Sequence, residues 1–205
     1  VAAERGAVIA AGSLEEALAG ADVALVAVPV AALPSAVRDV LEAAPESCTV
    51  TDAGSTKESV CAAAAGDPRF IGGHPICGAE TQGPGRASAD LFDGATWFLT
   101  PLAATEPDRY RTIHALVAAL GARPVAIDPI AHDRLVAVTS HLPHALANVL
   151  LNQAGSSRVD GHEPLAAAGG SLRDMTRIAG ANPRIWVDIF LDNRDALASA
   201  LAEHR

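Results

Sequence analysis

Several features that define other protein classes are missing from this 205-residue sequence. Basic residues are in the minority, since 15 Lys and Arg stand against 24 Asp and Glu. The resulting net charge of −9 argues against a nucleic-acid partner, which needs a basic face. No apolar run reaches the length that spans a bilayer, and nothing resembles a signal peptide. We therefore expect no membrane partner.

Cysteine and aromatic residues are also scarce. The three cysteines, Cys48, Cys61 and Cys77, are an odd number without paired spacing, which predicts reduced thiols and a cytoplasmic protein. Aromatic residues make up only 3%, so alanine dominates the apolar half of the composition. The sequence also lacks an initial methionine and ends at Arg205 within a helical pattern. We expect it to be a fragment of a longer protein.

What the sequence does contain is a regular alternation of strand and helix patterns. Short apolar runs predict strands over residues 23–28, 49–52, 70–73, 96–100 and 123–127. Helical patterns between them cover residues 33–44, 57–65 and 107–120. Alternation at this spacing predicts an α/β fold with a doubly wound, parallel sheet.

Strand patterns stop after Asp128. Residues 130–153 form one long helical pattern, in which Pro143 removes a backbone hydrogen bond and predicts a kink. A short helix is expected over residues 172–179, and Asn182-Pro183 starts a last helix that runs toward Arg205. We therefore predict an α/β domain over residues 1–128 and an all-helical domain over residues 129–205.

Ligands of open parallel sheets bind at the carboxyl ends of the strands. Three segments lie at such ends: Val28-Pro29-Val30, the turn from Asp52 to Lys57, and Gly73-His74-Pro75. The turn offers the Ser55 hydroxyl, the Lys57 cation and free N–H groups at a helix start, which suit a phosphate or a carboxylate. An ordinary capped turn is the alternative interpretation.

His74 is the candidate general base, because it lies at a strand end among glycines and an imidazole titrates near neutral pH. Glu80 follows six residues later, at the start of a long glycine-rich loop. A surface or hydrogen-bonded histidine is the alternative. Nothing near Cys77 in the sequence would lower its pKa, so we interpret it as a buried spectator.

The helical region carries further candidates. His141 and His144 share a helix face, whereas His132 lies nearly opposite on a straight helix. We rank substrate contact first for this pair, an inter-helix hydrogen bond second and a metal site last, because no zinc spacing is completed. Arg173, Asp174 and Arg177 form either a carboxylate-binding fork or a solvated ion pair, and Trp186 is a pocket wall or core.

Seven motifs in order resemble the prephenate/arogenate dehydrogenase family of tyrosine biosynthesis, over nearly the whole chain. They are Asp-Ala-Gly-Ser-Thr-Lys (52–57), Gly-Gly-His-Pro-Ile-Cys-Gly-Ala-Glu (72–80), Leu-Phe-Asp-Gly-Ala-Thr-Trp (91–97), His-Asp (132–133), Thr-Ser-His-Leu-Pro-His (139–144), Gly-Gly-Ser-Leu-Arg-Asp-Met-Thr-Arg-Ile-Ala (169–179) and Asn-Pro-x-x-Trp (182–186).

The resemblance implies NAD- or NADP-dependent oxidative decarboxylation of prephenate, a dicarboxylate. His74 matches the family's base, Ser55 the serine that bonds the reacting hydroxyl, and Arg177 the arginine that binds a substrate carboxylate. Further matches to the substrate pocket are His141, His144, Glu80, Asp174 and Trp186. The cofactor is expected against Val28, Pro29, Val30, Ser55 and Lys57.

The resemblance also implies a homodimer through the helical domain. The family's glycine-rich phosphate loop and first strand are absent, so the Rossmann-like sheet is expected to be incomplete at its N-terminus. Prephenate, arogenate and an amino-deoxy analogue stay open as substrates, as do NAD and NADP. A β-hydroxyacid dehydrogenase would need a lysine base that residues 130–205 lack. A non-catalytic dimeric ligand-binding module is the remaining alternative.

Overall fold

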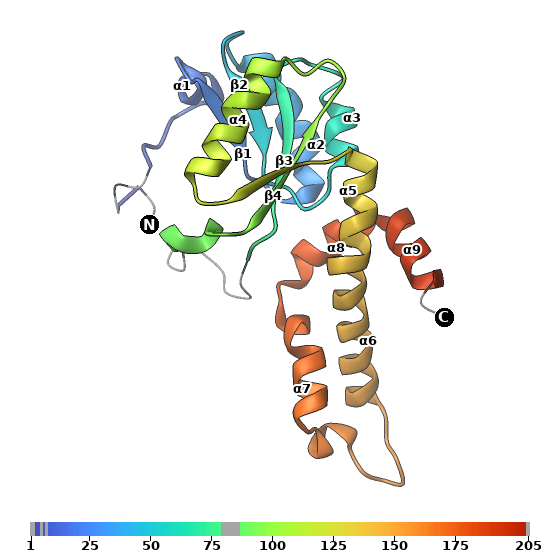
Figure 1. Ribbon diagram of the computed structural model, residues 1–205. Helices are drawn as coiled ribbons and strands as arrows, with labels where there is room; N and C mark the ends of the chain where they lie inside the picture. Colours follow the sequence, from blue (N-terminus) through green and yellow to red (C-terminus); the bar gives the residue numbers. More distant parts are fainter. Residues whose placement is uncertain (1–2, 5, 7, 79–86, 204–205) are drawn as a thin grey trace. The chain divides into compact units, whose positions relative to one another are not determined.

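The computed structural model describes residues 3–4, 6, 8–78 and 87–203 (Figure 1). The chain divides into two compact units, Val1–Asp133 and Arg134–Arg205. This division falls inside helix α5 (Pro129–Val136), a few residues beyond the predicted boundary at residue 128. None of the helices in the described ranges combines the length and the apolar character needed to span a membrane.

The first unit is built on one five-stranded sheet in the order β1-β2-β3-β4-β5. The strands are β1 (Val23–Val26), β2 (Thr49–Asp52), β3 (Phe70–Pro75), β4 (Thr96–Pro101) and β5 (Arg123–Ala126). The pairs β1–β2, β2–β3 and β4–β5 are parallel, as predicted. The β3–β4 pair is antiparallel, so the prediction of a wholly parallel sheet was wrong at this one place.

The connection between β3 and β4 gives the physical reason. A parallel neighbour needs a crossover, usually an α-helix, whereas an antiparallel neighbour does not. In its described part this connection holds only the 3-10 turn η3 (Ala89–Phe92), while α2 (Leu33–Ala43), α3 (Glu58–Ala63) and α4 (Pro107–Ala119) link the parallel strands.

Helices cover both faces of the sheet (Figure 1). Successive strand residues point to opposite faces, so Phe70 packs in one core with α2 and α3 while Ile71 packs in a second core with α4. The short helix α1 (Leu14–Leu18) adds Leu18 to the first core, and the 3-10 turn η1 (Val30–Ala32) precedes α2. The predicted two-sided arrangement is confirmed.

The second unit is helical, as predicted, and starts with an irregular turn. After α5 the chain forms a π-helical turn, η4 (Ala137–His141), and then α6 (Leu142–Ser156). Pro143 has no N–H to donate to the turn before it, and that turn widens. The predicted interruption of the long helix therefore takes the form of a π-helical turn just before Pro143.

The remaining elements are η5 (Pro164–Ala167), α7 (Gly170–Thr176), η6 (Arg177–Gly180), α8 (Pro183–Asp192) and α9 (Arg194–Glu203). Asn182 caps α8 by accepting from the Arg184 N–H, as predicted. The single last helix was a wrong prediction, because Asn193 leaves helical geometry between α8 and α9. Its side chain lies 3.1 Å from His141 Nδ1, which fixes the break.

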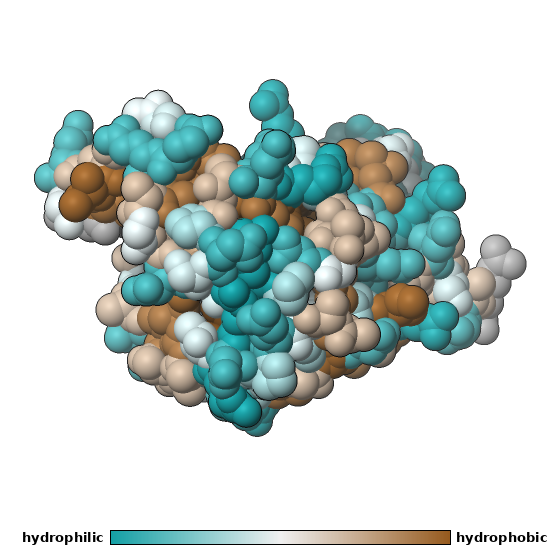
Figure 2. All heavy atoms as spheres, turned by 90° about the horizontal axis from the view of Figure 1, so that it is seen from above, coloured by the Kyte–Doolittle hydropathy of each residue, from teal (hydrophilic) through white to brown (hydrophobic). Residues whose placement is uncertain are grey.

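The surface mixes polar and apolar residues. Figure 2 shows hydrophobic residues in separate groups among hydrophilic ones on the face that it presents. In the second unit the most exposed large apolar side chains include Leu191 at 67%, Val149 at 59% and Met175 at 59%.

Candidate active site

The carboxyl ends of β2 and β3 are tied together by one buried carboxylate. Asp52 ends β2 and is fully buried. Its Oδ1 accepts from the Gly73 N–H at 3.0 Å, and its Oδ2 accepts from the Gly54 N–H at 2.7 Å. The turn after β2 and the end of β3 are therefore held at the same edge of the sheet, where ligands of this fold bind.

Lys57, the only lysine in the sequence, completes this arrangement. Its ammonium forms a salt bridge with Asp52 Oδ2, and both side chains are 0% exposed. A buried charge needs such a partner, because desolvation is costly. Contact between the Lys57 side chain and a cofactor would require this pair to open, so the predicted cofactor role of Lys57 stays a prediction. Ser55, in the same turn, is half-buried.

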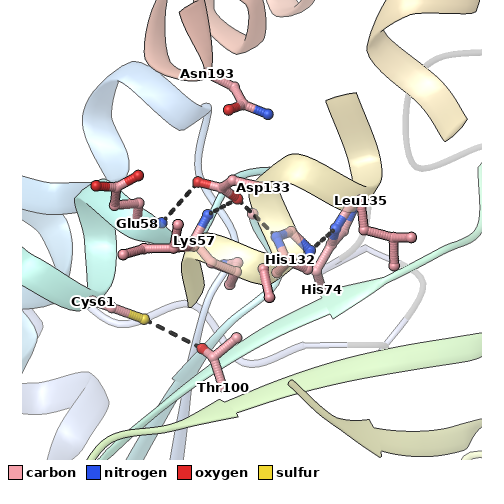
Figure 3. A network of polar contacts seen from close by, with 12 residues as sticks. Lys57, Glu58, Cys61, His74, Thr100, His132, Asp133, Leu135 and Asn193 are labelled. Carbon is pink, nitrogen blue, oxygen red and sulfur yellow. Dashed lines mark hydrogen bonds and ion pairs between the residues drawn. The ribbon is translucent and has the colours of Figure 1, made fainter. Parts of the chain in front are cut away.

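His74 lies within the last two residues of β3, opposite Phe98 of β4. Its ring is half-buried, and its Nδ1 lies 2.9 Å from Nε2 of His132. The two imidazoles meet edge to face, with ring centroids 5.0 Å apart (Figure 3). His74 is thus held by a second histidine, His132, which lies near the C-terminal end of the first unit in sequence.

His132 is in turn bonded to Asp133. Its Nδ1 lies 2.7 Å from Asp133 Oδ1, and the His132 side chain is 0% exposed. Asp133 also accepts from the Lys57 N–H at 2.8 Å and from the Glu58 N–H at 2.9 Å, at the start of α3 (Figure 3). The carboxylate therefore caps a helix N-terminus, which favours its negative charge.

Sequence reasoning missed this role of His132. We expected His132 to lie on the helix of His141 and His144, nearly opposite them, whereas it packs against His74 within the first unit. The one available signal was the His-Asp pair at positions 132–133, which follows a cap by Asp128 at the start of α5.

The cysteines take no part in this network of charges. Burial raises the pKa of Cys61 to about 11, and its Sγ lies 3.2 Å from the Thr100 hydroxyl. Burial also raises the pKa values of Cys48 and Cys77. All three thiols are free and favour the neutral form, which makes them poor nucleophiles.

The residues predicted to meet a cofactor differ in exposure. Val28 is 38% exposed just beyond β1, and Pro29 is also exposed. Val30 is only 7% exposed and belongs to the core. Val28 and Pro29 therefore present apolar surface at a strand end, whereas the Val30 side chain is buried.

In the second unit, His141 and His144 gather around Trp186. The His144 ring stacks on the indole at a centroid distance of 3.5 Å and an angle of 8°, and His141 meets Trp186 edge to face at 6.1 Å. Both histidines are buried, and burial lowers the pKa of His144. This geometry fits an aromatic wall and the inter-helix bond between His141 and Asn193.

The predicted arginine cluster is exposed. Arg173 and Asp174 lie on α7, and Arg177 begins η6, directly after that helix. Glu80 lies outside the described residues. Within the described ranges, no group of three or more His, Cys, Asp or Glu residues could hold a metal ion.

Two known family domains together match nearly the whole chain. Residues 1–126 match the family described as "Prephenate dehydrogenase, nucleotide-binding domain". Residues 128–205 match the family described as "Prephenate dehydrogenase, dimerization domain".

Two curated relatives are similar over most of the chain. The prephenate dehydrogenase of Bacillus subtilis is 35% identical over 160 residues, which are 75% of this chain and 43% of that protein. The cyclohexadienyl dehydrogenase of Zymomonas mobilis is 33% identical over 192 residues, 92% of this chain and 66% of that protein. The chain thus spans less than two thirds of either relative.

Solved structures agree with these similarities. A prephenate dehydrogenase from Aquifex aeolicus, crystallised with hydroxyphenyl propionate and NAD+, superposes with a TM-score of 0.91 at 29% identity. It covers 99% of this chain, and 72% of the crystallised chain is covered. The arogenate dehydrogenase of Synechocystis superposes with a TM-score of 0.82 at 28% identity, covering 100% of this chain and 74% of that one.

Proposed function

Since the chain belongs to the prephenate dehydrogenase family, we propose that it carries out the NAD(P)-dependent oxidative decarboxylation of prephenate to 4-hydroxyphenylpyruvate, in tyrosine biosynthesis. The observation that carries the proposal is the placement of His74, half-buried at the carboxyl end of β3 and hydrogen-bonded through Nδ1. An imidazole held in this way can accept a proton at its other nitrogen.

The cofactor residues suit a nicotinamide. Val28 and Pro29 offer exposed apolar surface at the end of β1, and Ser55 offers a hydroxyl at the end of β2. Small-molecule sites combine such apolar surface with a few polar groups that fix orientation. When bound, the nicotinamide supplies the hydride acceptor. The "nucleotide-binding domain" match over residues 1–126 supports this assignment.

The chain's own residues handle the proton and the charges. His74 takes the proton of the ring hydroxyl while the carbon that bears it loses hydride, and Ser55 orients that hydroxyl. The bond from the ring to its carboxylate then breaks, carbon dioxide leaves, and the electron pair completes the aromatic ring. The phenolate oxygen finally recovers the proton. Arg177 is the proposed partner of a substrate carboxylate, in an otherwise acidic protein.

Arogenate is a second candidate substrate, because the arogenate dehydrogenase of Synechocystis is almost as similar in structure. We further propose that the protein is a cytoplasmic homodimer through its helical unit. The "dimerization domain" match over residues 128–205 and the exposed apolar side chains of α6 and α8 support the dimer.

The decisive assay follows reduction of NAD and of NADP by the full-length protein, with prephenate and arogenate tested side by side. His74→Asn should cut kcat by about 10²–10⁴-fold, the usual worth of a general base, with cofactor affinity kept. His114→Asn, an exposed histidine on α4, is the matched control and should keep full turnover. Unchanged turnover in His74→Asn would dismiss the base, and inactivity of the wild type with every pair would favour a non-catalytic ligand-binding role.

The substrate carboxylate is tested separately. Arg177→Ala should weaken substrate binding by about 1.5–3 kcal/mol, the worth of a hydrogen bond between charged groups, and raise KM accordingly. Arg184→Ala, an exposed arginine on α8, is its control. An unaltered KM for Arg177→Ala would remove this residue from the site.

A further inference from the structure

Asp133 and His132 form a chain of short polar contacts that leads to His74, the proposed base. From the start of α3 these contacts run through Asp133 to His132 Nδ1 at 2.7 Å and from His132 Nε2 to His74 Nδ1 at 2.9 Å. The His132 and Asp133 side chains are 0% and 4% exposed, so water does not compete for the bond between them.

The donors around Asp133 decide where the protons lie. Backbone N–H groups can only donate, and those of Lys57 and Glu58 point at the two oxygens of Asp133. A carboxylate at this helix start therefore acts as acceptor only, and His132 must carry its proton on Nδ1. Nε2 of His132 is then the acceptor toward His74, which carries its proton on Nδ1.

The consequence falls on the far side of the His74 ring. With the proton on Nδ1, the lone pair that accepts a proton lies on Nε2. The tautomer of a histidine is set by the bond that its other nitrogen makes. Here that bond is set in turn by Asp133, two steps away.

We propose that Asp133 and His132 are positioning residues for the base: together they fix the tautomer of His74 and stabilise its positive charge when it takes the substrate proton. The proposal rests on the proposed function. No proton needs to pass beyond His74, because its Nδ1–H stays bonded to His132 throughout.

Other groups around His132 leave this assignment intact within the first unit. Phe98 of β4 meets the His132 ring edge to face at 5.4 Å and does not titrate. Lys57 and Glu58, at the start of α3, donate to Asp133 through their backbone N–H groups. The Lys57 ammonium forms its salt bridge with Asp52 instead. Asp133 and His74 are the ionisable partners on the two ring nitrogens.

The test is Asp133→Asn in the full-length protein. The new amide has one oxygen and can accept from only one of the two α3 N–H groups. When its NH₂ group stands in place of Oδ1, the Glu58 N–H keeps an acceptor, the Lys57 N–H loses one, and His132 Nδ1 faces a donor. His132 would then be protonated on Nε2 and would donate to His74, whose proton would move to Nε2. We expect a loss in kcat of about 100-fold or more, since the lone pair of the base is displaced.

His132→Gln is the contrasting variant. Its side-chain oxygen can replace Nε2 as acceptor and so keep the His74 tautomer, and we expect a smaller loss than for Asp133→Asn. Urea unfolding of both variants supplies the control. If the two residues have only a structural role, the loss of turnover in each variant should follow its loss of stability. Asp133→Asn and His132→Gln would then differ in kcat only as far as they differ in stability, and that result would overturn the proposal.

Nuclear magnetic resonance of isotopically labelled histidine gives a readout that does not depend on turnover. Wild-type His74 and His132 should both be protonated on Nδ1, and Asp133→Asn should move both protons to Nε2. The variants His74→Asn and His132→Gln each remove one ring and assign the signals. A wild-type His74 protonated on Nε2 would overturn the proposal even if the enzyme is active. If wild-type His74 and His132 are both protonated on Nδ1 but the protein oxidises neither prephenate nor arogenate, the positioning role would be upheld and the proposed function refuted.

Discussion

At the scale of single residues, burial in this protein works in opposite directions on different groups. It raises the pKa of the Cys61 thiol to about 11 and lowers the pKa of the His144 imidazole, because in both cases the neutral form is favoured. His144 also stacks on Trp186, so its neutral ring is part of the packing of the second unit.

This burial predicts a pH dependence of stability. The pKa of His144 in the folded state lies below its ordinary value of 6.5, so the unfolded chain takes up the proton first as the pH falls. Stability from this group is complete above pH 6.5 and is lost as the pH falls through the folded-state pKa. His144→Gln should therefore flatten the fall in the free energy of unfolding between about pH 7.5 and about pH 5.5.

Urea unfolding at the two pH values measures this effect. His162→Gln is the control, because His162 is exposed. Its pH dependence should match that of the wild type. Equal slopes in all three proteins would mean that His144 does not contribute.

Local sequence could reveal some site residues but not others. His74 could be predicted, since a histidine among glycines at a strand end is a local pattern. The contact between His74 and His132 joins positions 58 apart, and no local pattern encodes it. The same holds for Asp133, which reaches the start of α3 across 76 positions.

At the scale of elements, β3 depends on its glycines for a close approach to β2. A Cβ at Gly73 would lie 2.4 Å from the Asp52 carbonyl oxygen, which is backbone and cannot move aside. Gly73→Ala should destabilise the protein by about 1–3 kcal/mol, as overpacking does. The midpoint of urea unfolding measures the loss.

Gly180→Ala is the matched control, because a Cβ there meets nothing within 4 Å. It should leave the midpoint unchanged or slightly raised, since alanine reduces the freedom of the unfolded chain. If Gly73→Ala behaves like Gly180→Ala, the two strands are not held as closely as described.

The elements themselves could largely be predicted from the sequence. Apolar runs and caps located all five strands and the helices between them. The direction of β4 could not be predicted, because it depends on the connection from β3 rather than on the residues of the strand. The break at Asn193 was missed for a similar reason, since it is fixed by a bond to His141, 52 positions away.

At the scale of the whole molecule, the proposed dimer predicts an effect of charge on one exposed helix. Leu191 of α8 is 67% exposed, and an aspartate there would have to be desolvated in a subunit interface. Leu191→Asp should shift the protein from a dimer toward a monomer in sedimentation velocity. Leu116→Asp, on α4 of the first unit, is the control and should stay dimeric. A wild type that sediments as a monomer would contradict the proposed dimer.

The two-domain organisation followed from the end of the strand patterns after Asp128, but the boundary between the compact units could be located only from the contacts in the structure. The family matches change between residues 126 and 128, whereas the compact units change after Asp133. His132 and Asp133 thus follow the family boundary in sequence and belong to the first unit by packing. Only the partners of their side chains, which lie far away in the sequence, reveal this.

The burial of Lys57 has a practical side. Since it is the only lysine in the sequence and is 0% exposed, amine-directed dyes, crosslinkers and coupling surfaces find no lysine to react with in the native fold. Acylation of this side chain must wait until the turn after β2 opens. In a protein of these 205 residues, the extent of its modification over time would then report how often this edge of the sheet opens locally, without background from other lysines.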